Sequence, residues 1–141
     1  MPDDARDVRG VIDTSVVIDL DRADPTGLPR ELAISAVTLA ELAAGPHAAM
    51  DEAERARRQD RLQRVEAAFD PLPFDARTAR AFGRIYAATA SAGRKARGRR
   101  ALDLLIAATA LAEDLPLYTR NPDDFAGLEE LVRVETVDTA G

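Results

Sequence analysis

The sequence contains no cysteine, and its only histidine is His47. Without cysteine the chain has no disulfide, no thiolate zinc site and no cysteine nucleophile. A single histidine also excludes a histidine cluster for zinc, and we expect His47, beside Gly45-Pro46, to be an exposed loop residue. A Ser-His-Asp triad would depend on that one histidine, and no serine is indicated beside it. These absences leave carboxylates as the main candidates for chemistry.

Aromatic residues and long apolar runs are also scarce. The chain has no Trp, two Tyr and four Phe, which leaves little material for stacking on nucleic-acid bases. No apolar run approaches the ~20 residues that cross a bilayer. The acidic start MPDDARD is unlike a signal peptide, and GRKARGRR lacks the spacing of a phosphate-binding P-loop. We expect a cytoplasmic protein with no membrane partner.

The length and charge limit the class of protein further. A chain of 141 residues with 46% hydrophobic residues predicts one domain, covering residues 1–141. The net charge of −6 argues, by itself, against nucleic-acid binding. Cations held by clustered carboxylates would reverse the sign locally. The charge is also uneven, because one basic block contains no acid: Arg94, Lys95, Arg97, Arg99 and Arg100.

Short apolar stretches alternate with helical patterns along the chain. We predict strands over 11–12, 32–34, 72–74, 117–119 and 132–137, and helices over 14–23, 36–44, 51–69, 76–92 and 101–114. Gly45-Pro46 is expected to end the second helix, residues 93–98 to form a basic loop, and Asn121-Pro122 to turn the chain. This alternation predicts the α/β class, an α/β/α sandwich with a central parallel sheet.

Asp103 is the most informative acid because it interrupts an apolar helical stretch. It is the only charged residue between Arg100 and Glu113. A lone carboxylate in a buried helix is costly unless it is paired, hydrated or bound to a cation. One interpretation is a structural ion pair with Arg99 or Arg100, both within helical reach. We favour a cation ligand, since an exposed ion pair would not need so apolar a helix.

Three further positions repeat this pattern. Glu41 is the sole charge in SAVTLAELAAG, although a solvated outward-facing glutamate would also fit. Asp13 ends the apolar stub Val11-Ile12, at the place where α/β sheets hold their sites; it also suits a helix N-cap, and one carboxylate can do both. In YTRNPDDF one of Asp123 and Asp124 can face Asp13, and a plain polar turn is the alternative.

Carboxylates in this number suit hard cations with oxygen ligands, Mg²⁺ or Mn²⁺. Metal ions of this kind promote phosphodiester hydrolysis by activating water and stabilising the leaving 3′ oxygen. Such chemistry leaves a 5′-phosphate and needs no 2′-hydroxyl. The basic block Arg94–Arg100 is then placed to hold a nucleic-acid backbone, whereas a solvated loop that aids solubility is the simpler alternative.

The four motifs in order resemble the PIN-domain ribonucleases, and among these the VapC toxins of bacterial type II toxin–antitoxin pairs. The matching stretches are VIDTSVVIDL, SAVTLAEL, RRALDLLIAATAL and YTRNPDDF, and the resemblance extends over residues 8–137. It implies an Mg²⁺-dependent endoribonuclease in which Asp13, Glu41, Asp103 and Asp124 are catalytic metal ligands. It also implies supporting hydrogen bonds from Thr14, Ser15 and Asn121.

The same resemblance implies a set of partners. These are an RNA substrate and a small antitoxin that blocks the site. Because aromatic residues are scarce, we hypothesise that specificity comes from RNA shape, as in a structured tRNA or ribosomal loop. The family also implies a homodimer, and operator DNA bound only through the toxin–antitoxin complex.

Two other functions fit parts of the sequence. One is an aspartyl phosphotransfer enzyme, but such sites usually have a second Asp two residues after the first, where this chain has Ser15. The other is a non-catalytic protein whose acidic pocket binds an arginine of a partner.

Overall fold

Four short parallel strands form the central sheet of the computed structural model, which describes residues 6–140. The strand order is β2-β1-β3-β4. Val11 of β1 pairs with Ala33 of β2 on one side and with Leu117 of β3 on the other. The bounds are β1 Arg9–Ile12, β2 Glu31–Ala33, β3 Leu117–Thr119 and β4 Val134–Thr136. The strands therefore all point the same way, and β1 lies inside the sheet.

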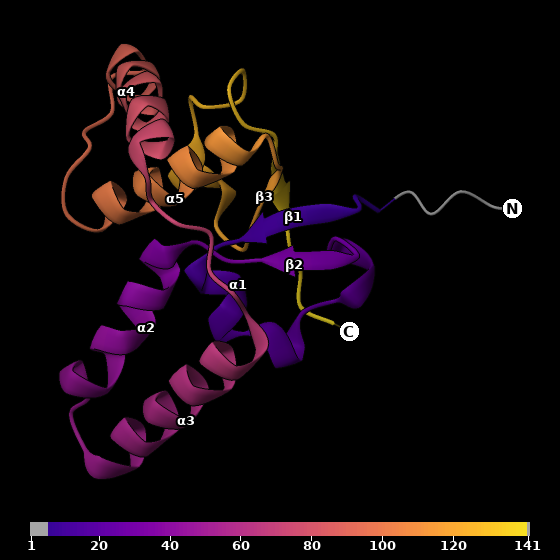
Figure 1. The fold of residues 1–141 in the computed structure, drawn as a ribbon, viewed down its shortest axis with the longest axis vertical. Helices are drawn as coiled ribbons and strands as arrows, with labels where there is room; N and C mark the ends of the chain where they lie inside the picture. The colour runs from indigo at the N-terminus through magenta and orange to yellow at the C-terminus, as the bar shows by residue number, and fades with distance from the viewer. Residues whose placement is uncertain (1–5, 141) are drawn as a thin grey trace, which may run out of the picture.

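Helices cover both faces of this sheet (Figure 1). On one face lie α4 (Ala76–Ser91) and α5 (Arg99–Glu113). On the other lie α1 (Thr14–Ile18), α2 (Ala36–Ala48) and α3 (Glu52–Ala68), with α2 and α3 packed as a hairpin. The predicted α/β/α sandwich with a central parallel sheet is confirmed.

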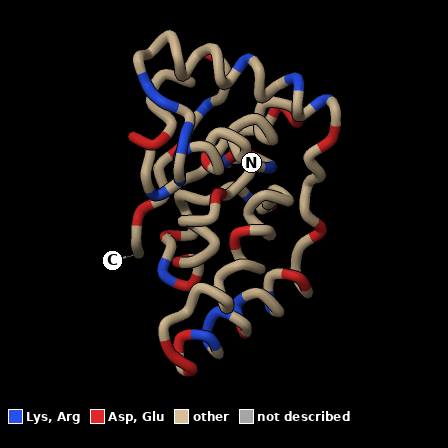
Figure 2. The backbone as a smooth tube through the Cα atoms, turned by 90° about the vertical axis from the view of Figure 1, so that its left-hand side faces the viewer, with Lys and Arg blue, Asp and Glu red and all other residues tan. Residues whose placement is uncertain are grey.

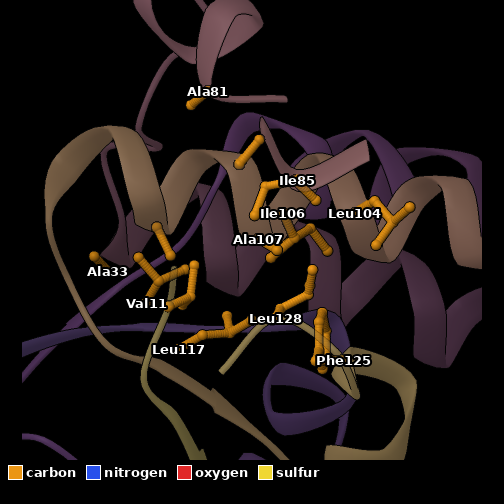
Figure 3. Packing of buried hydrophobic residues seen from close by; sticks show 13 residues of the cluster. Val11, Ala33, Ala81, Ile85, Leu104, Ile106, Ala107, Leu117, Phe125 and Leu128 are labelled. Carbon is orange, nitrogen blue, oxygen red and sulfur yellow. The ribbon is translucent and has the colours of Figure 1, made fainter. Parts of the chain in front are cut away.

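Alternating side chains of the strands build two cores. Val11 and Leu117 point toward α4 and α5, where they pack with residues such as Ile85 and Ile106 (Figure 3). Ile12 and Tyr118, the next residues along the same strands, belong to a second cluster with residues of α1, α2 and α3. Successive residues of a strand face opposite sides, so each strand contributes to both cores.

Side chains cap the starts of four helices. The N-caps are Asp13 for α1, Ser35 for α2, Asp51 for α3 and Asp75 for α4. Each side chain accepts a hydrogen bond from a backbone N–H in the first turn, where the helix itself supplies no i→i−4 acceptor. These caps account for the accuracy of the predicted helix starts. No helix within residues 6–140 combines the length and apolarity needed to cross a membrane.

Two predicted helices have the wrong ends. The helix predicted over 14–23 stops at Ile18 and continues as a 3-10 turn, η1 (Leu20–Arg22), where Asp19 pairs with Arg120. The helix predicted to end before Gly45 instead continues to Ala48. Arg58 of α3 donates to the Gly45 carbonyl at 2.9 Å, and Pro46 is buried. Packing against α3 therefore offsets the N–H that proline lacks. His47 is exposed as predicted, but it lies in this last turn and not in a loop.

The remaining differences concern strands. The strand predicted over 72–74 is a single bridge from Leu72 to Ser35. Pro71 and Pro73 flank Leu72 and have no N–H for a ladder, so pairing stops after one residue. The last strand covers Val134–Thr136 instead of 132–137, and β2 lies one residue earlier than predicted. The strand over 117–119 is confirmed, as is the irregular loop over 93–98.

Gly10 is expected to be essential for packing, and Gly83 dispensable. A Cβ at Gly10 would lie 2.5 Å from Cε1 of Tyr118, whose hydroxyl is held by Asp7. A Cβ at Gly83, within α4, would meet nothing within 4 Å. We predict that Gly10→Ala lowers the free energy of unfolding by about 1–3 kcal/mol and that Gly83→Ala raises it by about 0.5–1 kcal/mol. Urea unfolding followed by circular dichroism measures both, and equal effects would contradict this account of the sheet.

Candidate active site

Asp13 leaves the carboxyl end of β1 and is held there by its own surroundings. Its carboxylate accepts a hydrogen bond from the Val16 N–H at 3.1 Å and from the Ser15 hydroxyl at 2.6 Å. Only 4% of Asp13 is exposed, and this burial raises its pKa despite the hydrogen bonds that favour the charged form. Asp13 is thus a helix cap and, at the same time, a nearly buried carboxylate.

Glu41 is oriented by a hydroxyl of the neighbouring helix. Thr14 donates to Oε1 of Glu41 at 2.7 Å, and its Oγ1 is also hydrogen-bonded to Oγ1 of Thr38 at 3.1 Å. Thr38 is fully buried, and its N–H donates to the N-cap Ser35. Glu41 is therefore half-buried and held toward α1, not solvated on the outer face. Thr38 was not among the predicted site residues, although its place three residues after the N-cap Ser35 is the signal that marks it.

The other three predicted acids affect the pKa of Asp103. Its pKa is raised to about 6, mainly by burial and then, in decreasing order, by the charges of Asp124, Asp13 and Glu41. Arg99 acts in the opposite direction, more weakly. Charges shift a pKa this way only when they lie near the group. The other three predicted acids, which come from separate stretches of sequence, therefore lie near Asp103.

The structural ion pair considered for Asp103 is not formed. Neither Arg99 nor Arg100 lies within 4 Å of its carboxylate in the part of the chain that the structure describes. Arg100 instead donates to the carbonyl oxygen of Asp124 at 3.3 Å. Arg99 lines a cavity of about 340 Å³ together with Thr14 and Glu41. The first turn of α5 thus brings positive charge to the edge of the site without neutralising Asp103.

The two adjacent acids after β3 differ in their surroundings. They lie in the 3-10 helix η3 (Pro122–Phe125), which is anchored by the buried ring of Phe125. Asp124 is half-buried and is the largest electrostatic influence on Asp103, whereas Asp123 is exposed. Asn121 is also exposed, and no hydrogen bond of its side chain is found within residues 6–140. Asp124 therefore lies near Asp103, and the supporting hydrogen bond expected from Asn121 is not formed among the described residues.

The carboxylates face one another without forming a ready-made coordination sphere. Within residues 6–140 no three acidic or histidine side chains are gathered closely enough to hold a metal ion. Their chemistry nevertheless fits one, because carboxylate oxygens are the preferred ligands of Mg²⁺ and Mn²⁺. The repulsion that raises the pKa of Asp103 is also what a bound cation would relieve.

The site lies at the edge of the sheet toward which the arrows of β1 and β2 point in Figure 1. Figure 2 views the molecule from that side, with acidic positions of several segments near the centre.

The residues of the basic block Arg94–Arg100 divide into two groups. Arg99 and Arg100 belong to the first turn of α5 and adjoin the acids, while Arg94, Lys95 and Arg97 lie in the loop that precedes it.

Comparisons with known proteins agree with this geometry. The sequence model of the PIN domain family matches residues 10–131. The chain is 39% identical over 131 residues to "Ribonuclease VapC5" of Mycobacterium tuberculosis, covering 91% of this chain and 93% of that protein.

Solved structures show the same fold. A crystal structure of VapBC-5 from M. tuberculosis, described as a member of the VapBC family of toxin–antitoxin systems, matches with a TM-score of 0.78 and 40% identity over 92% of this chain and 97% of that chain. FitAcB from Neisseria gonorrhoeae matches with a TM-score of 0.69 and 26% identity over 88% and 94%. VapBC2 from Rickettsia felis, solved with a promoter DNA fragment, is 21% identical with a TM-score of 0.68 over 92% and 99%, which shows the fold alone. On its sequence, its sheet order and its acidic edge, the chain belongs to the PIN domain family.

Proposed function

We propose that this protein is a toxin-type, metal-dependent endoribonuclease that hydrolyses RNA phosphodiester bonds. The observation that supports the proposal is that Asp13, Glu41 and Asp124, from three separate segments, lie near enough to Asp103 to raise its pKa. The 39% identity to a ribonuclease over most of both chains supports the same reaction.

In this proposal Asp13, Glu41, Asp103 and Asp124 hold Mg²⁺ or Mn²⁺. A divalent ion held by these carboxylates would lower the pKa of a bound water and would polarise the scissile phosphate. The chain's own hydroxyls position the ligands: Ser15 fixes the carboxylate of Asp13, and Thr14 fixes that of Glu41. Asn121 remains a predicted supporting residue without a contact to the acids.

Positive charge beside the acids supports an anionic substrate. Arg99 shares the 340 Å³ cavity with Glu41, and on the side of α3 the cavity is lined by Arg61 and by Arg58, which is paired with Glu54 of the same lining. A phosphodiester strand entering this cavity would meet guanidinium groups next to the metal ligands, which orients the phosphate and offsets the net charge of −6.

The partners follow from the similarity to VapBC-5, whose description names a toxin–antitoxin system. We propose a small antitoxin that neutralises this chain by covering the acidic edge. A homodimer, operator DNA bound through the toxin–antitoxin complex, a single domain over residues 1–141 and a cytoplasmic location stay predictions.

RNA cleavage should depend on Asp103 and not on Asp123. Loss of groups that merely support a metal ligand costs about 10–100-fold, so we expect Asp103→Asn to lower the cleavage rate by about 100-fold or more with Mg²⁺ or Mn²⁺. Asp123→Asn makes the same chemical change at an exposed position and should cleave like the wild type. Gel assays on total cellular RNA measure both, and equal rates for Asp103→Asn and the wild type would refute the proposed reaction.

Metal-free stability should reveal the charge repulsion at Asp103. Its pKa of about 6 lies above the unfolded value of 3.8, so the folded state binds this proton more tightly. Its contribution to stability is therefore present below about pH 4 and is lost as pH rises through about 6. After allowance for solvent screening, we expect the free energy of unfolding of Asp103→Asn at pH 7 in EDTA to be about 1 kcal/mol higher than that of the wild type. This corresponds to a Tm about 3 °C higher.

The same pair of proteins should melt alike at pH 4. The readout is the difference between variant and wild type, because carboxyls of lowered pKa such as Asp7 affect both equally and in the opposite sense. Mg²⁺ should raise the Tm of the wild type more than that of Asp103→Asn. A variant less stable than the wild type at pH 7 without metal would show that Asp103 has a structural role.

Substitutions of Asp13 should separate its two roles. Asn keeps a side-chain oxygen for the Val16 N–H, whereas Ala removes this acceptor and leaves only the backbone carbonyl of residue 13, also at 3.1 Å. We expect Asp13→Asn to keep or raise the metal-free Tm. The free energy of unfolding of Asp13→Ala should be about 1 kcal/mol lower than that of Asp13→Asn. Both variants should lose RNA cleavage. Thermal melts in EDTA, paired with the cleavage assay, measure this, and a large Tm loss for Asp13→Asn would mean that the charge itself stabilises the helix start.

A further inference from the structure

A second cavity lies between the last turns of α4 and the loop that leads to α5. Its volume is about 410 Å³, and it is separate from the cavity that contains Glu41. The lining combines one aromatic ring, three cations and two small apolar residues: Tyr86, Arg94, Lys95, Arg97, Ala90 and Ala96. No acid lines this cavity among the described residues, although the chain has 25 acidic residues against 19 basic ones.

Tyr86 lines this cavity, and its ring packs against a second aromatic ring of α4. The residue is 53% exposed, and no hydrogen bond of its hydroxyl is found within residues 6–140. The ring of Phe82, one turn earlier on α4, packs against it with centroids 6.2 Å apart and planes inclined by 51°. Phe82 in turn packs against the core formed with α5. Tyr86 is thus exposed to solvent and is not part of the core, while its contact with Phe82 limits the movement of its ring.

The cations that line this cavity are unpaired among the described residues. Arg94, Lys95 and Arg97 form no ion pair within 4 Å there, whereas arginines of α3 such as Arg57 and Arg64 pair with acids of their own helix. Arg94 is near enough to Glu129 to help lower that pKa, but the two do not pair. Three cations left unpaired in an acidic protein indicate an anionic ligand from outside the chain.

The loop also connects this cavity to the proposed active site. Lys95 precedes Arg99 by four residues, and Arg99 lies one helical turn before Asp103. Chain geometry therefore limits the distance between the Cα atoms of Lys95 and Asp103 to about 20 Å. In Figure 1 the loop lies on the side toward which β1 and β2 point. A few nucleotides of a single strand would cover this distance.

We infer that this cavity is a nucleotide-binding subsite for single-stranded RNA, in which a base stacks on Tyr86 and the neighbouring phosphates contact Arg94, Lys95 and Arg97. The inference rests on the proposed ribonuclease function and extends its substrate-binding surface beyond the scissile phosphate. An aromatic face with unpaired cations around it is the arrangement by which proteins hold single strands without reading their sequence.

Binding of a non-cleavable complex tests the subsite directly. Asp103→Asn in EDTA is mixed with a fluorescently labelled single-stranded RNA of about ten nucleotides, and anisotropy gives the Kd. Adding Tyr86→Ala should weaken binding by about 10-fold, whereas Tyr86→Phe keeps the ring and should bind within about 2-fold. Arg97→Gln should weaken binding and reduce the slope of log K against log salt by about 0.7. Arg84→Gln makes the same charge change on α4 outside the cavity and should have no effect.

Tyrosine emission gives a second readout that is specific for stacking. The chain has no Trp, and its only other tyrosine is Tyr118, which is buried and bonded to Asp7. In a Tyr118→Phe background all tyrosine emission comes from Tyr86, and the RNA should quench it. An abasic strand of the same length, which offers phosphates without bases, should bind more weakly and quench little.

Several results would overturn the inference. One is an unchanged Kd for Tyr86→Ala, with folding confirmed by the Tm. Another is equal quenching by the abasic strand. A third is a change in sedimentation of Tyr86→Ala without a change in RNA binding, which would identify this face as a contact between protein chains. The proposed function fails separately, by equal cleavage in wild type and Asp103→Asn, whatever the outcome at Tyr86.

Discussion

The position of β1 in the middle of a parallel sheet is the constraint on which the site depends. Val11 packs into one core and Ile12 into the other, so the strand cannot shift along its axis without disturbing both. Its carboxyl end is therefore held in place, and Asp13 with it. Because all the strands run in one direction, the segments that follow β1 and β3 leave the sheet at the same edge. Asp13 and Asp124 meet there for this reason.

The same edge carries an electrostatic cost. Burial and three neighbouring acids raise the pKa of Asp103, and no described cation pairs with it. The apolar packing of α5, whose Leu104, Ile106 and Ala107 are almost fully buried, holds the carboxylate in spite of this cost. The repulsion between these carboxylates therefore lowers the stability of the metal-free protein. Perturbed carboxylates of this kind are common at functional sites.

Positive charge in this protein is arranged by distance from the acids. Arg99 and Arg100 adjoin them, and the loop cations surrounding Tyr86 lie further out, along the same side of the molecule. Several other arginines form ion pairs on the surface, such as Arg57 and Arg64 on α3, and such exposed pairs contribute little to stability individually. A net charge of −6 therefore conceals a local surface suited to a polyanion, and overall charge alone is a poor guide to the ligand.

The sequence by itself determined the fold class and most helix starts, because caps and periodicity are local patterns that need no distant partner. It also suggested the site acids, but its residues did not decide between Asp123 and Asp124. It failed where distant contacts decide: Arg58 of α3 extends α2 past Gly45, and Asp19 with Arg120 ends α1 early. Only the tertiary structure showed that Asp103 lacks an ion pair, that Asp124 faces it while Asp123 does not, and that Tyr86 adjoins the basic loop. These facts depend on distances between residues far apart in the chain, which no local pattern records.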